Sequence, residues 1–390
     1  MRRVPDSLAR IADSYLLVYR MPAVRGGQAI ATAMLFVPRS PVPRSGFPVV
    51  TFCHGTVGWS ARWAPSLCVE NASHPKMGAH WELALPVADL LESGHVVVAP
   101  DYEGLGDTSL GVPTTGHPYY CRLSEGRSIG FAAVATKRAL GDRVSNAWAA
   151  VGHSQGGKAV LSTAQTLDEV RAAQLDLAFQ GAVAIAPSTN SRLKMNERWG
   201  CVQAAAATFN PDGAIFYLGA LNAYCILYVR ALISAGYAID PALMFGERAL
   251  RAYAERSDLD FYSLLLEMTD DAARYIYCDV KDGSVFNRPD GYPGARTEGI
   301  NSGTFKEAME ENEVGRVFLP GEFLIVQGAT DSWTPESWCR ELVNTMLSQG
   351  TSVRYSVQTG ADHYGVLQSP AARALVQQHL GHLFGGRREL

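Results

Sequence analysis

The sequence lacks the closely spaced cysteines of zinc-binding or disulfide-rich proteins. Its seven cysteines are scattered over 390 residues, and no two of them form a Cys-x-x-Cys pair. Structural zinc sites usually draw ligands from such pairs, so zinc-type spacing is absent. An odd number of cysteines in a chain of this length indicates mostly buried thiols, with one or two disulfides as the open alternative.

Charge of either sign is also sparse. Asp, Glu, Lys and Arg make up 18% of the chain, and the net charge is -4. Proteins that bind nucleic acid through charge carry a basic face, so we expect no nucleic-acid partner. The hydrophobic content of 47% is typical of a globular protein with a sizeable core.

No hydrophobic run has the length and continuity of a membrane span. The most apolar stretch, residues 214–229, contains Asn222 and ends at Arg230, so we expect no integral membrane segment. The opening Met1-Arg2-Arg3 is not followed by the apolar run of a secretory signal. We therefore expect a cytoplasmic protein as the chain stands, or a secreted one if a signal was removed.

What the chain does contain is an alternation of strands and helices. An antiparallel hairpin is expected first, followed by buried strands and amphipathic helices in turn. The hairpin is expected at 14–19 and 29–37, the strands at 47–53, 95–100, 147–151 and 181–186, and the helices at 81–91, 125–140 and 157–173. Such an alternation implies a parallel sheet with right-handed crossovers and helices on both faces.

The alternation stops after residue 187 and resumes near residue 321. Strands are expected at 323–327 and 353–357 and a final helix at 371–384, whereas the roughly 130 residues before them have mostly helical spacing. A crossover needs only about a dozen residues. We therefore predict an α/β fold with a mostly parallel central sheet, a core at 1–187 and 321–390, and an inserted helical cap or lid at 188–320. An independent second domain is the alternative.

The pentapeptide Gly152–Gly156, Gly-His-Ser-Gln-Gly, lies between an expected strand and an expected helix. In that position a Gly-x-Ser-x-Gly pattern predicts a nucleophile elbow, in which a strained turn projects the serine hydroxyl off the edge of the sheet. Glycine is needed on both sides because larger side chains would collide where strand and helix meet. Ser154 is therefore the expected nucleophile.

A serine nucleophile needs a base, and the base needs an acid that orients it. Three histidines follow Ser154, and of these His363 lies in the loop after the strand 353–357, while His379 and His382 fall in the final helix. His363 is the expected base. The fold places the acid between nucleophile and base in chain order.

Asp331 follows the strand 323–327 and is the expected acid, since catalytic groups gather beyond the carboxyl ends of parallel strands. Its alternative role is to cap the next helix. Asp362 is the rival acid, but it adjoins His363 in sequence and is poorly placed to accept from that imidazole. We interpret Asp362 as a residue that orders the loop.

The oxyanion of the reaction needs two hydrogen-bond donors. We expect the backbone N–H of Gln155 at the helix start and that of Thr56 in the loop after the strand 47–53, with Gly55 and Val57 as alternatives for the second. His54 and His153 are expected to bond loop backbone.

Several aromatic residues are candidates for the substrate pocket. Tyr102 and Glu103, after the strand 95–100, are expected to shape the pocket floor and brace the oxyanion loop rather than to form a metal or acid–base pair. Phe216, Tyr217 and Tyr224 lie in the expected cap. A capping helix must also bury one apolar face against the sheet, so each of these could simply be core.

These motifs together resemble the secretory-lipase family of fungal lipase A and its bacterial relatives. The resemblance covers most of residues 25–370 and is weakest in the cap. It implies an α/β-hydrolase fold, ester hydrolysis by Ser154, Asp331 and His363, and a cap that forms an acyl tunnel. The motifs that carry it are His54-Gly55-Thr56, residues 101–106, Ser124-Glu125-Gly126-Arg127, residues 152–157, Thr330-Asp331 and Asp362-His363.

The predicted function is that of a carboxylic ester hydrolase, an esterase or lipase, that works through an acyl-enzyme without metal or organic cofactor. The expected partner is a small-molecule ester or acyl compound, with contact to a lipid interface as a possibility when the cap opens. A serine peptidase or amidase on the same fold is the first alternative, and a non-catalytic binding protein is the second. The residues do not indicate an oligomeric state.

Overall fold

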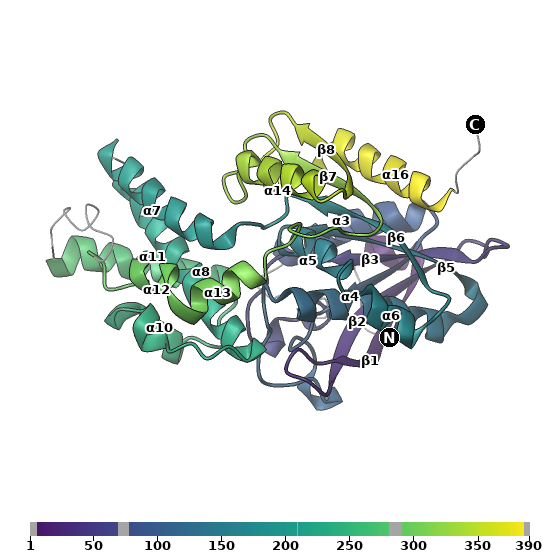
Figure 1. The fold of residues 1–390 in the computed structure, drawn as a ribbon, viewed down its shortest axis with the longest axis horizontal. Coiled ribbons are helices and arrows are strands. Elements are labelled where there is room, and N and C mark those ends of the chain that lie inside the picture. Colours follow the sequence, from purple (N-terminus) through teal and green to yellow (C-terminus); the bar gives the residue numbers. More distant parts are fainter. Residues whose placement is uncertain (1–5, 69–77, 209, 281–290, 386–390) are drawn as a thin grey trace.

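The computed structural model describes residues 6–68, 78–208, 210–280 and 291–385. Its centre is one eight-stranded sheet with the strand order β1-β2-β4-β3-β5-β6-β7-β8 (Figure 1). The strands are β1 Ala12–Pro22, β2 Gln28–Pro38, β3 Phe47–Cys53, β4 Val96–Pro100, β5 Val144–His153, β6 Ala178–Ile185, β7 Glu322–Gly328 and β8 Ser352–Gln358.

The sheet is antiparallel at one edge and parallel elsewhere. The expected hairpin is confirmed, with β1 and β2 paired antiparallel from Ala12 opposite Pro38 to Pro22 opposite Gln28. Strand β2 then pairs antiparallel with β4, and every later pair is parallel. Because the strands β3 to β8 all run one way, their carboxyl ends meet at a single edge, and the loops that follow them lie together there.

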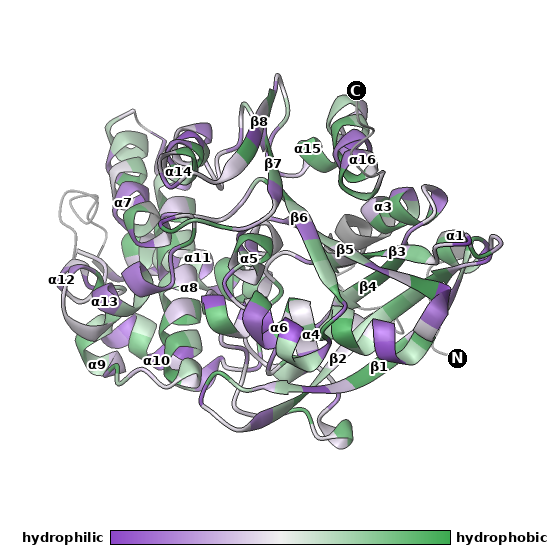
Figure 2. Cartoon of the chain, turned by 45° about the vertical axis from the view of Figure 1, so that its right-hand side comes forward, coloured by the Kyte–Doolittle hydropathy of each residue, from purple (hydrophilic) through white to green (hydrophobic). Residues whose placement is uncertain are grey.

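Helices cover both faces of the sheet, as predicted (Figures 1 and 2). On one face α4, α5, α6 and α14 share a core with residues such as Val49 and Ile325. On the other face α3, α15 and α16 pack on the alternate positions, Val50 and Val326. These helices are α3 Gly78–Glu92, α4 Arg122–Leu140, α5 Gln155–Thr163, α6 Leu167–Ala173, α14 Glu336–Ser348, α15 Gly365–Gln368 and α16 Pro370–Phe384.

One expected helix is divided in two. The prediction of a single helix over 157–173 is wrong, because α5 ends at Thr163 and α6 begins at Leu167. At the break the backbone forms tight turns, in which the N–H of Gln165 bonds the carbonyl of Ser162 and that of Thr166 bonds Thr163. The Thr166 hydroxyl also donates to the Thr163 carbonyl, which is how threonine competes with helical hydrogen bonding.

Between β6 and β7 the described residues form helices with a core of their own. In Figure 1 these inserted helices stand beside the sheet, and loops after β3 and β8 reach them through the bridge between Gly58 and Asp260 and the hydroxyl contact between Tyr262 and Tyr364. They are α7 Ser191–Ala207, α8 Pro211–Ala235, α9 Pro241–Met244, α10 Glu247–Glu255, α11 Phe261–Arg274, the π-helical turn Tyr275–Val280, α12 Thr297–Asn301 and α13 Gly303–Glu311.

Helix α8 is longer than the sequence suggested. Pro211 starts it under an Asn210 cap and Gly236 ends it, so it has 25 residues. Our judgement that this stretch is too short to cross a membrane is therefore wrong, because an 18-residue window within it has a mean hydropathy of 1.5. That window is 89% buried inside the protein. Among the described residues it is the one helix with such length and composition.

Six of the seven cysteines have described side chains, and all six are free thiols. Four of them, Cys53, Cys121, Cys225 and Cys339, are buried. Burial raises the pKa of the Cys53 and Cys225 thiols, which keeps them protonated and unreactive. This agrees with the expectation of mostly buried thiols.

Candidate active site

Ser154 occupies a strained turn between β5 and α5. Its backbone angles are φ 57° and ψ -115°, outside the regions that side chains favour. The turn is held by the bond from the Ser154 N–H to the Ile185 carbonyl, at 2.9 Å. A Cβ on Gly156 would lie 2.0 Å from the Cys53 carbonyl oxygen, and one on Gly152 would lie 2.3 Å from the Gly156 carbonyl oxygen. The two glycines are therefore required by close backbone contact.

His363 lies beside this serine, in the loop between β8 and α15. Its Nε2 is 3.0 Å from the Ser154 Oγ, and its Nδ1 is 2.7 Å from an Asp331 carboxylate oxygen. A neutral imidazole that donates from Nδ1 to the carboxylate presents Nε2 as an acceptor for the serine hydroxyl. The three side chains thus form a continuous hydrogen-bonded row in the order that general-base activation of a serine needs.

Asp331 is fixed by several donors besides the imidazole. One carboxylate oxygen accepts from the backbone N–H groups of Trp333 and Thr334, both at 2.8 Å. The other accepts from the Thr334 hydroxyl at 2.7 Å and from the Gln327 amide at 3.1 Å. Burial alone would raise the pKa of this carboxyl, but the bonds from His363 and Thr334 outweigh it and lower the pKa to about 2. Asp331 is thus anionic next to the imidazole.

Asp362 has a different environment. Its side chain is exposed, and one oxygen accepts from the N–H groups of Tyr364 and Gly365, at 3.2 and 2.6 Å. This local turn orders the loop that carries His363. The structure therefore brings Asp331, and not Asp362, to the Nδ1 atom of His363.

The two expected oxyanion donors lie close to the serine. Gln155 is the first residue of α5, where backbone N–H groups have no partner within the helix. Gly55 and Thr56 line the same pocket as Ser154. Val57 does not belong to that lining, and its carbonyl accepts from the Phe261 N–H at 3.1 Å.

The residues expected to support this loop are buried behind it. The Tyr102 hydroxyl donates to the His54 carbonyl at 3.1 Å, and an imidazole nitrogen of His54 lies 2.7 Å from the Gly55 carbonyl. Glu103 accepts from the Ser124 hydroxyl at 2.6 Å and from the Val24 N–H at 3.0 Å. The Glu103 carboxylate therefore takes part in hydrogen bonds that hold these segments together.

His153 also bonds backbone, as expected, with its Nε2 2.8 Å from the His363 carbonyl. In the described part of the chain, no group of three or more His, Cys, Asp or Glu residues is arranged to hold a metal ion.

The pocket above Ser154 is narrow and has an aromatic wall. Of the four predicted pocket residues, Tyr224 is the one in its lining. Tyr102 is completely buried, Phe216 packs edge-on against Trp333, and Tyr217 packs against Phe216. The pocket is lined by Gly55, Thr56, His153, Ser154, Tyr224, Phe261, Tyr262, Trp333, His363 and Tyr364.

Sequence reasoning missed four of these aromatic residues. Trp333 and Tyr364 stand within two positions of Asp331 and His363, so adjacency in the chain was an available signal. Phe261 and Tyr262 begin α11, and nothing in the sequence separates them from the other apolar residues of the inserted helices. The hydroxyls of Tyr262 and Tyr364 bond each other, which joins the inserted helices to the loop of His363.

A buried ion pair supports the serine turn from behind. Lys158 and Glu125 are both completely buried, and the ammonium lies 2.9 Å from the carboxylate. The second oxygen of Glu125 accepts from the Gln155 amide at 3.1 Å and from the Tyr120 N–H at 3.0 Å. Sequence reasoning did not anticipate this pair, because its members are 33 residues apart and belong to different helices.

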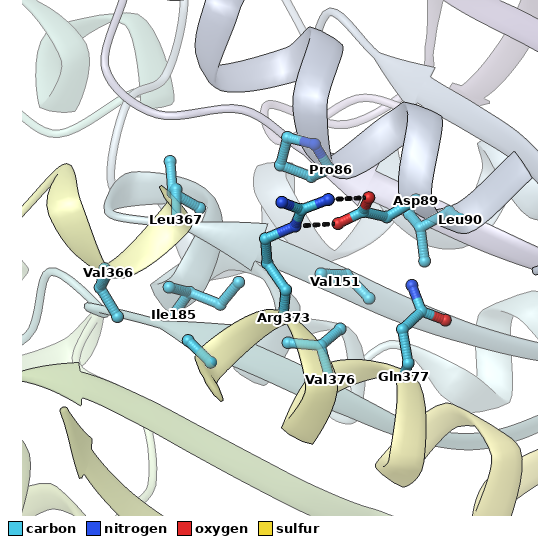
Figure 3. Close-up of a pocket in the computed structure, with 11 residues that line it drawn as sticks. Pro86, Asp89, Leu90, Val151, Ile185, Val366, Leu367, Arg373, Val376 and Gln377 are labelled. Carbon is cyan, nitrogen blue, oxygen red and sulfur yellow. Dashed lines mark hydrogen bonds and ion pairs between the residues drawn. The ribbon is translucent and has the colours of Figure 1, made fainter. Parts of the chain in front are cut away.

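A second pocket lies between α3 and α16, on the face of the sheet that these helices cover (Figure 3). Its wall is apolar, with Val151 and Ile185 from the strands, and the ion pair of Arg373 and Asp89 crosses it. None of the three residues of the Ser154 row belongs to its lining. The chemistry therefore belongs to the narrow aromatic pocket.

No model of a known protein family matches the sequence, and no curated protein matches it. The structure is similar to that of Candida antarctica lipase A, with a TM-score of 0.60, 14% identity and coverage of 93% of this chain and 76% of that one. It is also similar to the rice cell wall degrading esterase LipA from Xanthomonas oryzae, with a TM-score of 0.62, 16% identity and coverage of 97% and 93%. The chain has the α/β-hydrolase fold of these lipase A-like proteins, as the sequence predicted.

Proposed function

We propose that this protein is a serine carboxylic ester hydrolase. The observation that carries the proposal is the row of Ser154, His363 and Asp331, with 3.0 Å between serine oxygen and imidazole and 2.7 Å between imidazole and carboxylate. The similarity to a lipase and an esterase of the same fold agrees with it.

In the first step the Ser154 oxygen attacks the ester carbonyl carbon while His363 Nε2 takes the hydroxyl proton. Asp331, anionic with a pKa of about 2, stabilises the imidazolium that forms. The negative charge on the former carbonyl oxygen is held by the N–H groups of Gln155 and Thr56. The intermediate collapses as the bond to the alcohol breaks, and the imidazolium gives its proton to the departing alcohol.

In the second step water attacks the acyl-serine. His363 takes a proton from the water, the bond between the acyl group and the Ser154 oxygen breaks, and the proton returns to that oxygen. The products are the carboxylic acid and the free enzyme. In this proposal the inserted helices act as the cap over the site, since Tyr224, Phe261 and Tyr262 supply part of its wall.

The proposal is tested with a chain-length series of p-nitrophenyl esters and one emulsified triglyceride. A narrow pocket with an aromatic wall should favour short or compact acyl groups. We expect kcat/KM to fall beyond the shorter chains and Ser154→Ala to lose at least about 10⁴-fold of the wild-type rate. Equal activity of Ser154→Ala would refute the covalent mechanism.

The amidase alternative is tested with matched substrates. A p-nitrophenyl ester and the p-nitroanilide of the same acid differ only in the leaving group. We expect the ester to be cleaved and the anilide to be essentially inert, because an amide carbonyl is less electrophilic than that of an aryl ester and its leaving nitrogen must be protonated before it departs. Comparable cleavage of both would assign the protein to the peptidases or amidases.

A further inference from the structure

Arg198, in the middle of α7, is buried, and two of its three guanidinium nitrogens have no acceptor in the described part of the chain. Only 5% of its surface is exposed, and its Nε and Nη2 atoms are buried with no partner among the described residues. Its guanidinium lies 5.1 Å from the centre of the Tyr224 ring and 5.2 Å from that of Trp333. Both rings line the pocket above Ser154. The unsatisfied charge is therefore in contact with the wall of the candidate active site.

A second buried arginine, Arg230, has the hydrogen-bond acceptors that a guanidinium with a structural role needs. Arg230 is also 5% exposed and also lies over two rings, those of Trp59 and Tyr253. Unlike Arg198, it donates to three backbone carbonyls within residues 252–256. Ring faces attract a cation but do not replace the acceptors that five N–H groups need.

The acid of the site does not serve as the missing partner. The two Asp331 oxygens already accept from His363, Thr334, Trp333 and Gln327. A buried guanidinium left without an anion or carbonyl is costly, and such groups persist in proteins mainly where a ligand completes them.

The segment that precedes the helix of this arginine is hydrogen-bonded to the nucleophile. The Ser188 N–H donates to the Ser154 carbonyl at 3.0 Å, and α7 begins three residues later. In the same segment the Thr189 hydroxyl is buried and has no partner among the described residues. The segment between the serine turn and the middle of α7 thus holds buried polar atoms of Thr189 and Arg198 that have no partner among the described residues.

We propose that Arg198 binds a carboxylate carried by the substrate, so that the preferred esters are anionic. This inference rests on the proposed ester hydrolysis. The guanidinium lies over two adjacent rings, neither of which supplies a hydrogen-bond acceptor, and a carboxylate is the anion that matches its N–H edge with two parallel bonds. The carboxylate belongs to either the alcohol or the acyl part of the ester, and the test separates the two.

Two matched substrate pairs provide the test. In the first, 4-acetoxybenzoate is compared with 4-acetoxybenzamide, so that the charge is on the alcohol side. In the second, the mono-p-nitrophenyl ester of adipic acid is compared with that of adipamic acid, so that the charge is on the acyl side. A charge-assisted bond is worth about 1.5–3 kcal/mol, so the wild-type kcat/KM should favour the carboxylate about 10- to 150-fold in one pair.

Variants then assign the preference to the arginine. Arg198→Met should abolish the ratio between the anionic and neutral members, and Arg198→Lys should keep part of it, because it retains the charge without the planar fork. Arg230→Met is the matched control, since it removes the other buried guanidinium and should leave the ratio as in the wild type.

The proposal is overturned if the wild type shows no preference for the carboxylate in either pair, a result that does not depend on any variant folding. It is also overturned if folded Arg198→Met keeps the preference. Failure of the proposed function looks different, because the wild type would then hydrolyse none of the four esters, or Ser154→Ala would hydrolyse them as fast as the wild type.

Discussion

At the scale of single residues, the hydrogen bonds of Asp331 explain why this carboxylate, and not its sequence rival, faces the imidazole. Asp331 accepts from two backbone N–H groups, a hydroxyl and an amide, which fixes both oxygens. Asp362 instead accepts hydrogen bonds from the backbone N–H groups of Tyr364 and Gly365 in a local turn. Position at a strand end predicted the first carboxylate, and adjacency to His363 in sequence was the argument against the second.

The two aspartates are therefore expected to differ in their effect on turnover. Asp331→Asn removes the charge that stabilises the imidazolium and should lower kcat by about 10³–10⁴-fold. Asp362→Asn keeps an acceptor for the turn and should stay within about threefold of the wild type. Steady-state hydrolysis of a p-nitrophenyl ester decides between them, and the reverse order would assign the acid to Asp362.

The residues that sequence reasoning missed share a physical reason. Ser154, Asp331 and His363 follow strand ends, and strand ends are visible as the limits of buried apolar runs. Phe261 and Arg198 belong to inserted helices, where helical spacing predicts a buried face but not which residue of that face meets the pocket.

At the scale of elements, the serine turn depends on close packing between β3 and the start of α5. Gly156→Ala would place a methyl group 2.0 Å from the Cys53 carbonyl oxygen, and backbone cannot move as cheaply as a side chain. We expect a loss of several degrees in Tm together with most of the activity. Gly200→Ala is the matched control, because its Cβ meets nothing within 4 Å and alanine favours a helix by about 1 kcal/mol. Equal Tm values for the two variants would show that the turn tolerates the methyl group.

The pair of Lys158 and Glu125 joins α5 to α4. Lys158→Met leaves the Glu125 carboxylate buried without its cation, which should cost about 3–5 kcal/mol of the free energy of unfolding. Adding Glu125→Gln removes the unpaired charge and should restore part of that loss. Denaturant unfolding of both single variants and the double variant measures the coupling, and strictly additive effects would mean that the two side chains do not interact.

Element prediction succeeded for the strands and failed at some helix ends. The seven residues of β3 were predicted without error, because a short continuous apolar run bounded by polar loops predicts a buried strand. The end of α5 at Thr163 depends on hydrogen bonds of Thr166 that propensity does not reveal. Helix α8 runs past Arg230 because carbonyls of a neighbouring helix satisfy that charge, which only the tertiary structure shows.

At the scale of the whole molecule, buried histidines make the fold sensitive to acid. Burial lowers the pKa of His117 to about 3 from 6.5, and it also lowers those of His95 and His379. An unfolded chain binds these protons below pH 6.5 while the folded one does not, so stability falls as the pH drops from 6.5 towards 3. The lowered pKa of Asp331 also makes stability fall with the pH, but only between about pH 4 and pH 2.

His117 should account for one proton of that dependence. Each proton bound only by the unfolded state contributes about 1.4 kcal/mol per pH unit to the slope of the unfolding free energy. His117→Gln should therefore be less steeply destabilised between pH 6 and 4 than the wild type. Denaturant titrations at several pH values measure the slopes, and parallel slopes would contradict a neutral buried His117.

The fold as a whole followed from the sequence, whereas the pocket did not. Strand order and crossovers are restricted by a few rules, so alternation along the chain leads to one sheet. The position of Tyr262 against Tyr364 depends on packing between segments about 100 residues apart, which no local pattern contains.

That Ser154 is the nucleophile is tested most directly by covalent labelling with diethyl p-nitrophenyl phosphate, followed by intact mass measurement and peptide mapping. We predict one diethylphosphoryl group per chain, located on Ser154, and no label on Ser154→Ala. Label on another residue, or equal labelling of the wild type and Ser154→Ala, would contradict the assignment of this serine.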